Sequence, residues 1–113
     1  MNLSMELLNK NHEYVLQLNG EIDVYTAPRL KKQLLPLVEQ GDRKIQIDLS
    51  HTTYIDSTGL GVFIQAYKEA QQNDCELELV HVQDRVLRLF QVTGLDRIMN
   101  VHESKFEGES IDE

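Results

Sequence analysis

Alternating apolar and polar side chains mark the first strands of this sequence. Residues 3–7 and 14–18 repeat with a period of two, which is typical of strands that bury one face. The polar residues 9–12 between them predict a hairpin connection. The same alternation returns at residues 44–49 and 76–82, so each of these segments predicts a further strand.

Three other segments carry apolar residues at the spacing of one helical face. The first should begin after Thr26, its expected N-cap, and end at Gly41, a good helix stop. The second is expected over about residues 57–72 and the third over residues 84–91. Residues 95–101 are again rich in apolar side chains and predict a short last strand.

The order of these elements predicts an α/β fold with one mixed sheet of about five strands and helices packed mainly on one face. The opening hairpin is antiparallel, whereas strands separated by helices favour right-handed parallel crossovers. We expect a single domain over residues 1–113 with a core at about 3–101. Residues 102–113 form an acidic C-terminal segment, which predicts a frayed helix or a disordered tail.

Charge and composition narrow the possible partners. The 113 residues include 19 acidic and 11 basic side chains, a net charge of −8 that repels nucleic acid and anionic membrane surfaces. No signal peptide is read at the start, and the apolar runs are far shorter than the roughly 20 residues that span a bilayer. Cys75 is the single cysteine, so no internal disulfide forms. We therefore expect a cytoplasmic protein.

The four histidines have no metal-ligand spacing, so neither a metal nor another cofactor is expected. They lie far apart along the chain, at His12, His51, His81 and His102.

The stretch 54–61, Tyr-Ile-Asp-Ser-Thr-Gly-Leu-Gly, is the strongest candidate for chemistry. A strand ends before it and a helix begins within it, so Ser57 and Thr58 should lie at a helix N-terminus that Asp56 helps to stabilise. Free backbone N–H groups and the helix dipole at such a terminus suit a hydroxyl that becomes a phosphate. We therefore hypothesise a binding surface controlled by phosphorylation of Ser57.

Three blocks of sequence resemble those of an anti-sigma factor antagonist with a STAS domain, most closely the antagonists of the general stress response. The resemblance extends over roughly residues 3–101. Its blocks are Gly20–Asp23 with Thr26–Leu30, then Tyr54–Phe63, then Asp84–Phe90 with Thr93–Leu95.

The resemblance implies a regulator that switches partners and is not an enzyme. The unmodified protein would bind an anti-sigma factor and so free a sigma factor. The anti-sigma factor would itself be a serine kinase that phosphorylates the antagonist and thereby loses its hold on it, and a separate phosphatase would reverse the reaction. The family's phosphorylated serine corresponds to Ser57, with Asp23 beside it, and the free protein is expected to be a monomer.

A phosphate on Ser57 would add about −1.5 to −2 charges at pH 7. With Asp23 and Asp56 nearby, we expect it in an acidic docking patch, where it acts on the interface and leaves the fold intact. Gly59 and Gly61 either let a kinase backbone and its nucleotide approach, or pack a helix tightly on the sheet. The expected partner contacts are Asp23, Tyr25, Thr26, Arg29, Asp56, Ser57, Thr58, Gly59 and Gly61.

Other functions remain as alternatives. An enzyme with Ser57 as nucleophile would need a nearby base, and the chain has no G-x-S-x-G elbow there. A small-anion or nucleotide-binding STAS module could use the same helix start, although the chain has neither a G-x-x-x-x-G-K-[ST] loop nor a lysine near Ser57. A receiver-type phospho-aspartate at Asp48 would lack a matching lysine on the final strand.

Overall fold

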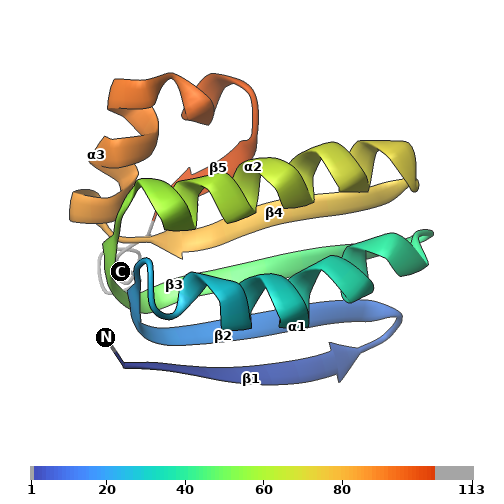
Figure 1. Cartoon of the computed structure of the whole chain (residues 1–113). Coiled ribbons are helices and arrows are strands. Elements are labelled where there is room, and N and C mark those ends of the chain that lie inside the picture. The colour runs from blue at the N-terminus through green and yellow to red at the C-terminus, as the bar shows by residue number, and fades with distance from the viewer. Residues whose placement is uncertain (1, 104–113) are drawn as a thin grey trace, which may run out of the picture.

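One mixed sheet organises residues 2–103, the part of the chain that the computed structural model describes (Figure 1). Five strands follow one another across this sheet in chain order. The strands are β1 (Leu3–Lys10), β2 (Glu13–Ile22), β3 (Arg43–Ile55), β4 (Cys75–Val82) and β5 (Asn100–Glu103). The helices within this range are α1 (Ala27–Gln40), α2 (Ser57–Gln72) and α3 (Asp84–Thr93), followed by a 3₁₀ turn at Leu95–Arg97. The predicted α/β class is confirmed.

The opening hairpin forms where the alternation predicts it. All of β1 pairs antiparallel with residues 13–20 of β2, and Lys10 lies opposite Glu13 at the closed end. The two residues between them, Asn11 and His12, have φ angles of +46° and +69°. Two positive φ angles in a two-residue turn match the right-handed twist of the flanking strands. Asparagine and histidine adopt this conformation more readily than most residues do.

The remaining strand pairs are parallel, so their helical crossovers bring three helix starts to one side of the molecule. β2, β3 and β4 all run in the same direction. They end at Ile22, Ile55 and Val82, and α1, α2 and α3 begin within five residues of these ends. We call this side, where the parallel strands end and the helices start, the C-terminal edge. The Ser57 motif therefore lies on the same edge as the loop after β2.

The core lies between the sheet and the helices. α1 and α2 run side by side over the same face of the sheet (Figure 1). Phe63 of α2 and Phe90 of α3 are fully buried, with ring centroids 6.3 Å apart, and they connect the two helices. Burying a side chain of this size stabilises the fold by roughly 1.5–3 kcal/mol. Within residues 2–103, no helix combines the length and apolar character that a bilayer crossing requires.

β3 is longer than its alternation predicts, because it continues through the polar residues 50–53 to Ile55. Thr52 explains the difference. Its side chain is fully buried, and its hydroxyl donates a hydrogen bond of 3.0 Å to the Leu18 carbonyl of β2. A threonine that finds such an acceptor can occupy a core position, since the cost of burying its polar group is offset. The register between β2 and β3 shifts just before this point, between Gln17 and Asn19.

The end of the described chain also differs from its prediction. Gly94 has a φ of +78° and caps α3, and its left-handed conformation turns the chain into the 3₁₀ turn. The Leu95 carbonyl then accepts hydrogen bonds from the backbone N–H groups of Ile98 and Met99. The last strand is therefore confined to β5. The acidic segment predicted from residue 102 begins inside this strand, and its residues 104–113 lie outside the described part of the chain.

Candidate functional site

Asp56 caps α2 and ties it to the sheet. Its carboxylate accepts a hydrogen bond of 3.0 Å from the Gly59 backbone N–H, which satisfies one of the free donors of the first helical turn. Its own backbone N–H donates to the Ile22 carbonyl at 3.1 Å. The predicted helix start is confirmed, and the start of α2 is joined to the end of β2.

Ser57 is the first residue of α2, and its side chain is exposed. Its hydroxyl makes no hydrogen bond to any residue in the range 2–103. Because Asp56 supplies the cap, the helix does not need this hydroxyl. Ser57 therefore offers a reachable hydroxyl at the positive end of a 16-residue helix, where an added negative charge is favoured.

A hydrogen-bonded turn precedes α1 on the same edge. One carboxylate oxygen of Asp23 accepts from the backbone N–H groups of Tyr25 at 2.9 Å and Thr26 at 3.0 Å. The Thr26 hydroxyl accepts from the Asp23 backbone N–H at 2.9 Å and donates to the Glu21 carbonyl at 2.8 Å. Thr26 does stand at the N-cap position of α1, but its hydroxyl holds the turn and makes no cap hydrogen bond to the helix.

The turn also favours the charged form of Asp23. Burial raises the pKa of this carboxyl, and the hydrogen bonds from the backbone N–H groups of Thr26 and Tyr25 lower it. The net effect is a pKa below the ordinary value of 3.8. Asp23 is only 8% exposed, and its carboxylate holds the turn.

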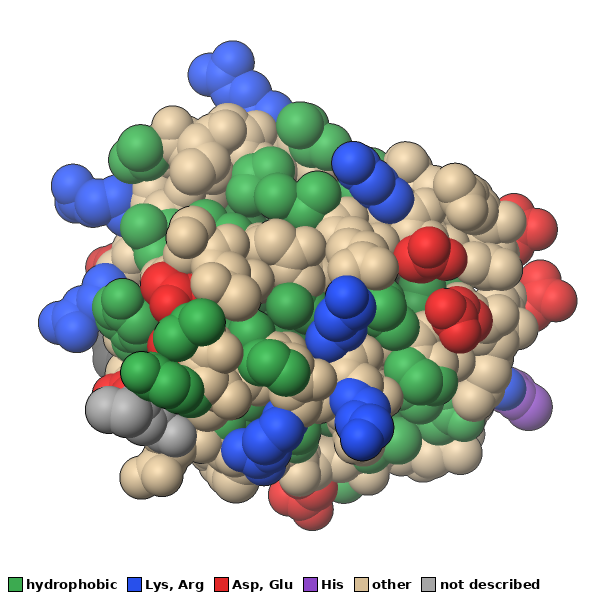
Figure 2. Space-filling model, in the orientation of Figure 1, with side chains coloured by type: hydrophobic (Ala, Val, Ile, Leu, Met, Phe, Trp, Pro, Cys, Tyr) green, Lys and Arg blue, Asp and Glu red, His purple; other side chains and the backbone are tan. Residues whose placement is uncertain are grey.

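Apolar side chains, more than acidic ones, surround the start of α2. The turn presents Val24 and Tyr25 to solvent with exposed fractions of 55% and 73%, and Tyr54, at the end of β3, is 49% exposed. Asp23 and Asp56 direct their carboxylates to backbone N–H groups. Figure 2 shows basic side chains scattered over the face of α1 and α2. The expected acidic docking patch is therefore replaced by an exposed apolar group of Val24, Tyr25 and Tyr54.

A groove between α1 and α2 continues this surface. Its lining residues come from the N-terminal halves of both helices and are Ala27, Pro28, Lys31, Thr58, Gly61, Val62 and Gln65. Most of these side chains are apolar or small, and Lys31 supplies the one positive charge among them. The groove begins one residue after Ser57.

The two glycines of the motif have different roles. A Cβ on Gly59 would lie 2.7 Å from the Ile22 Cγ2 and 3.0 Å from the Ile55 Cγ2, so this glycine permits the close packing of α2 on the sheet. A Cβ on Gly61 would meet nothing within 4 Å. The packing interpretation therefore applies to Gly59, and the open position of Gly61 leaves room for another molecule.

The structure separates the predicted contact residues by exposure. Asp23, Thr26 and Gly59 are buried and Asp56 is half-buried, so they offer a partner little surface. The exposed members are Tyr25, Arg29, Ser57, Thr58 and Gly61. Val24, Tyr54 and Lys31 are also exposed on this surface, although they were not among the contacts expected from the sequence.

The histidines give no support to a nucleophilic Ser57. The serine–histidine hydrogen bond within residues 2–103 joins Ser50 to its exposed neighbour His51 at 3.2 Å. Within the same range, no group of three or more His, Cys, Asp or Glu side chains could hold a metal ion.

Comparison with known proteins assigns the family. The family model described as the STAS domain matches residues 4–107. This chain belongs to the STAS domain family. A protein of Staphylococcus aureus named anti-sigma-B factor antagonist is 44% identical to it over 103 residues, which cover 91% of this chain and 95% of that protein. The family resemblance of the sequence blocks is confirmed.

Solved structures of the family share the fold. The structure of an anti-sigma factor antagonist from Mycobacterium paratuberculosis superposes with a TM-score of 0.82 at 22% identity, and covers 95% of this chain and 90% of that chain. The structure of the Bacillus cell fate determinant SpoIIAA in the phosphorylated form has a TM-score of 0.68 at 21% identity, and covers 98% and 97% of the two chains. These likenesses confirm the α/β architecture.

Gly59→Ala and Gly61→Ala form a matched pair that should change stability in opposite directions. At Gly61 the added methyl meets open space and removes the helix penalty of glycine, so the free energy of unfolding should rise by roughly 0.5–1 kcal/mol. At Gly59 the added methyl overlaps Ile22, and this overpacking should lower the free energy of unfolding by about 1–3 kcal/mol. Urea unfolding of both variants measures the difference, and equal effects would contradict the assigned roles.

Asp23→Asn should make the stability less dependent on pH. Because the pKa of Asp23 is lowered in the folded state, its carboxylate contributes stability that is present above about pH 4 and lost as pH falls through the folded-state pKa. The wild-type protein should therefore exceed Asp23→Asn in stability at pH 7, and the gap should close below about pH 4. Urea unfolding of both proteins at pH 7 and at a pH below about 4 measures this difference in stability. A gap that stays constant would contradict a stabilised carboxylate.

Proposed function

We propose that this protein is an anti-sigma factor antagonist of the general-stress type. Its unphosphorylated form binds an anti-sigma factor and so releases a sigma factor, which places its action in the cytoplasm. The 44% identity to the Staphylococcus aureus anti-sigma-B factor antagonist over nearly the whole of both chains supports this function. The observation that carries the proposal is the exposed Ser57 on a helix start that Asp56 caps independently.

Phosphorylation of Ser57 by the anti-sigma factor, acting as a serine kinase, is the proposed off-switch, and a phosphatase reverses it. The phosphate would sit at the N-terminus of α2, where backbone N–H groups and the helix dipole tolerate a negative charge. The Asp56 cap does not involve the Ser57 hydroxyl, so modification leaves the cap intact. The fold should therefore survive phosphorylation unchanged.

The loss of binding then comes from the interface. A partner that covers Val24, Tyr25 and Tyr54 must bring apolar surface close to Ser57. A phosphate there adds about −1.5 to −2 charges, which the partner must either desolvate or pair. A 1000-fold loss of affinity requires only about 4 kcal/mol, and one unpaired dianion in such a surface can supply that.

The proposed contact surface comprises exposed residues of both helix starts and of the turn. Thr58, Gly61 and Lys31 line the groove between α1 and α2, which extends the surface beyond Ser57. Arg29 is exposed on the first turn of α1. The full set is Val24, Tyr25, Arg29, Lys31, Tyr54, Ser57, Thr58 and Gly61. Asp23 and Thr26 contribute by holding the turn that presents Val24 and Tyr25.

Substitution at Ser57 tests the switch. Ser57→Ala should bind the anti-sigma factor as the wild type does and should not be released by ATP, whereas Ser57→Asp should bind more weakly because it places a charge in the interface. Thr58→Ala is the matched control and should be phosphorylated like the wild type. The partner is recovered by pull-down from source cells with and without ATP, and phosphate incorporation is read by intact mass. Stoichiometric phosphorylation of Ser57→Ala would refute the site.

Tyr25→Ala should weaken binding of the unphosphorylated protein at least tenfold, or about 1.4 kcal/mol, because central aromatic side chains dominate interface energies. The residue is 73% exposed, so the free energy of unfolding should change little. Val92→Ala is the control, since Val92 is 78% exposed near the end of α3 and lies outside the proposed contact set. Calorimetric titration of both variants with the anti-sigma factor decides the matter, and equal affinities would remove Tyr25 from the interface.

A further inference from the structure

Positive charge gathers on the helices of an otherwise acidic protein. The helices α1, α2 and α3 and the 3₁₀ turn carry seven basic and four acidic side chains, a net charge of +3. This leaves four of the 11 basic and 15 of the 19 acidic side chains to the rest of the chain, a net charge of −11. The helices are therefore positive, although the whole chain carries −8.

Three of these basic side chains lie in the first half of α1. Arg29, Lys31 and Lys32 are all exposed. The first turn of this helix holds no acidic side chain, and its last turn holds no basic one. The reverse order stabilises a helix, because the N-terminus is the positive end of the helix dipole. The stability of α1 therefore does not account for these charges.

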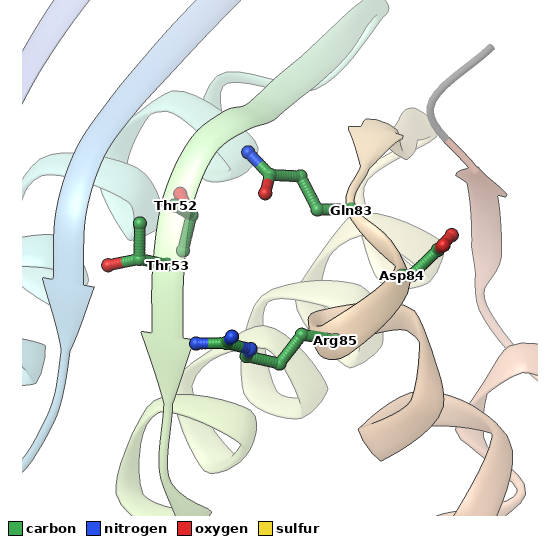
Figure 3. A pocket seen from close by; sticks show the side chains of 5 residues that line it. All are labelled: Thr52, Thr53, Gln83, Asp84 and Arg85. Atoms are coloured by element: carbon green, nitrogen blue, oxygen red, sulfur yellow. The ribbon is translucent and has the colours of Figure 1, made fainter. Parts of the chain in front are cut away.

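Arg85 supplies positive charge on the other side of Ser57. It lines a hollow between the end of β3 and the start of α3. Figure 3 shows its side chain extending from α3 toward Thr53 on β3, whereas the Asp84 carboxylate points away. Because β2, β3 and β4 are neighbours in that order, the start of α2 lies between the starts of α1 and α3. Exposed basic side chains therefore flank Ser57 on both sides. We call this set the basic flanks: Arg29, Lys31, Lys32 and Arg85.

No acidic side chain within residues 2–103 pairs with the basic flanks. The close contacts between cations and carboxylates in that range join Glu78 to Lys44 at 3.5 Å and to His102 at 4.0 Å. Asp23 and Asp56, beside Ser57, direct their carboxylates to backbone N–H groups at the helix starts. A molecule that approaches this edge therefore meets exposed cations that have no carboxylate partner in the described range.

We propose that the basic flanks steer an acidic docking surface of the anti-sigma factor onto Ser57. This inference rests on the proposed function and names the chemistry of its partner, an apolar centre that covers Tyr25 and Tyr54 and is bordered by carboxylates. Charges at the border of an interface act mainly on the association rate, and steering raises that rate by roughly tenfold or more. A phosphate on Ser57 lies between the flanks, so its negative charge cancels much of their attraction.

The test is the association rate of the unphosphorylated protein with the anti-sigma factor, measured by stopped-flow mixing without ATP. Raising the salt concentration from about 0.05 M to about 0.5 M should lower this rate by about tenfold, because salt screens the attraction between exposed charges. The net charge of −8 alone would give the opposite trend with an acidic partner, since salt would relieve a repulsion. The Debye length is about 10 Å at 0.1 M, whereas the smallest extent of the molecule is 27 Å, so the local charges decide the trend.

Lys32→Gln and Arg85→Gln test the two flanks separately, because neither residue belongs to the proposed contact set. Each should lower the association rate about two- to fivefold at low salt and leave the dissociation rate unchanged, and the loss should disappear at high salt. Lys10→Gln is the matched control. It removes the same charge from an exposed position at the closed end of the hairpin, on the opposite edge of the sheet, and should leave both rates unchanged.

The outcomes separate this inference from the proposed function. If the wild type does not bind the anti-sigma factor at either salt concentration, the proposed function and this inference are both wrong. If it binds with an association rate that salt leaves unchanged or raises, the inference is overturned while the proposed function stands. Equal effects of Arg85→Gln and Lys10→Gln would overturn the inference in the same way.

Discussion

The close approach of α2 to the end of β2 determines where the candidate surface lies. Gly59 packs so tightly against Ile22 that a side chain at position 59 would have to displace the Ile22 side chain. The hydrogen bond from the Asp56 backbone N–H to the Ile22 carbonyl maintains the same contact. Because of this contact, the first turn of α2 and the turn after β2 share one surface. Ser57 and Tyr25 are 32 residues apart in sequence, yet the contact between α2 and the end of β2 positions both of them.

Throughout this surface, residues that form hydrogen bonds lie next to residues whose side chains face solvent. Asp56 caps the helix, while the hydroxyl of Ser57, beside it, forms no hydrogen bond within residues 2–103. In the turn, Asp23 and Thr26 form the hydrogen bonds while Val24 and Tyr25 face solvent. A charge added at Ser57 can therefore change what the surface binds without removing any bond that maintains its shape.

Much of the fold follows from hydrophobic periodicity, because that pattern reports which face of each element is buried. The hairpin, the bounds of α2 and the mixed sheet were all predicted on this basis. Thr52 was missed because its burial depends on an acceptor in a different strand, Leu18, which no local pattern reveals. The last strand was predicted to begin too early, at residue 95. The left-handed conformation of Gly94 turns the chain into the 3₁₀ turn, so the apolar residues 98–99 precede β5.

The helix start that carries the candidate site was predicted correctly, whereas the chemical character of its surroundings was not. Residue types alone suggested an acidic surface, since Asp23 and Asp56 flank the motif. The direction of each carboxylate depends on backbone N–H groups that exist only once the turn and the helix have formed. Gly59 and Gly61 likewise look equivalent in sequence, and only the position of Ile22 distinguishes them.

The strand order has a consequence for how this chain can fold during synthesis. Each strand lies beside the one made just before it, so a nascent chain can extend the sheet from β1 toward β5 as it leaves the ribosome. The exposed edge of the growing sheet is covered each time by the next segment to emerge. None of the strands β1 to β5 must remain unpaired until a distant partner is made, which shortens the period in which an open edge could pair with another chain.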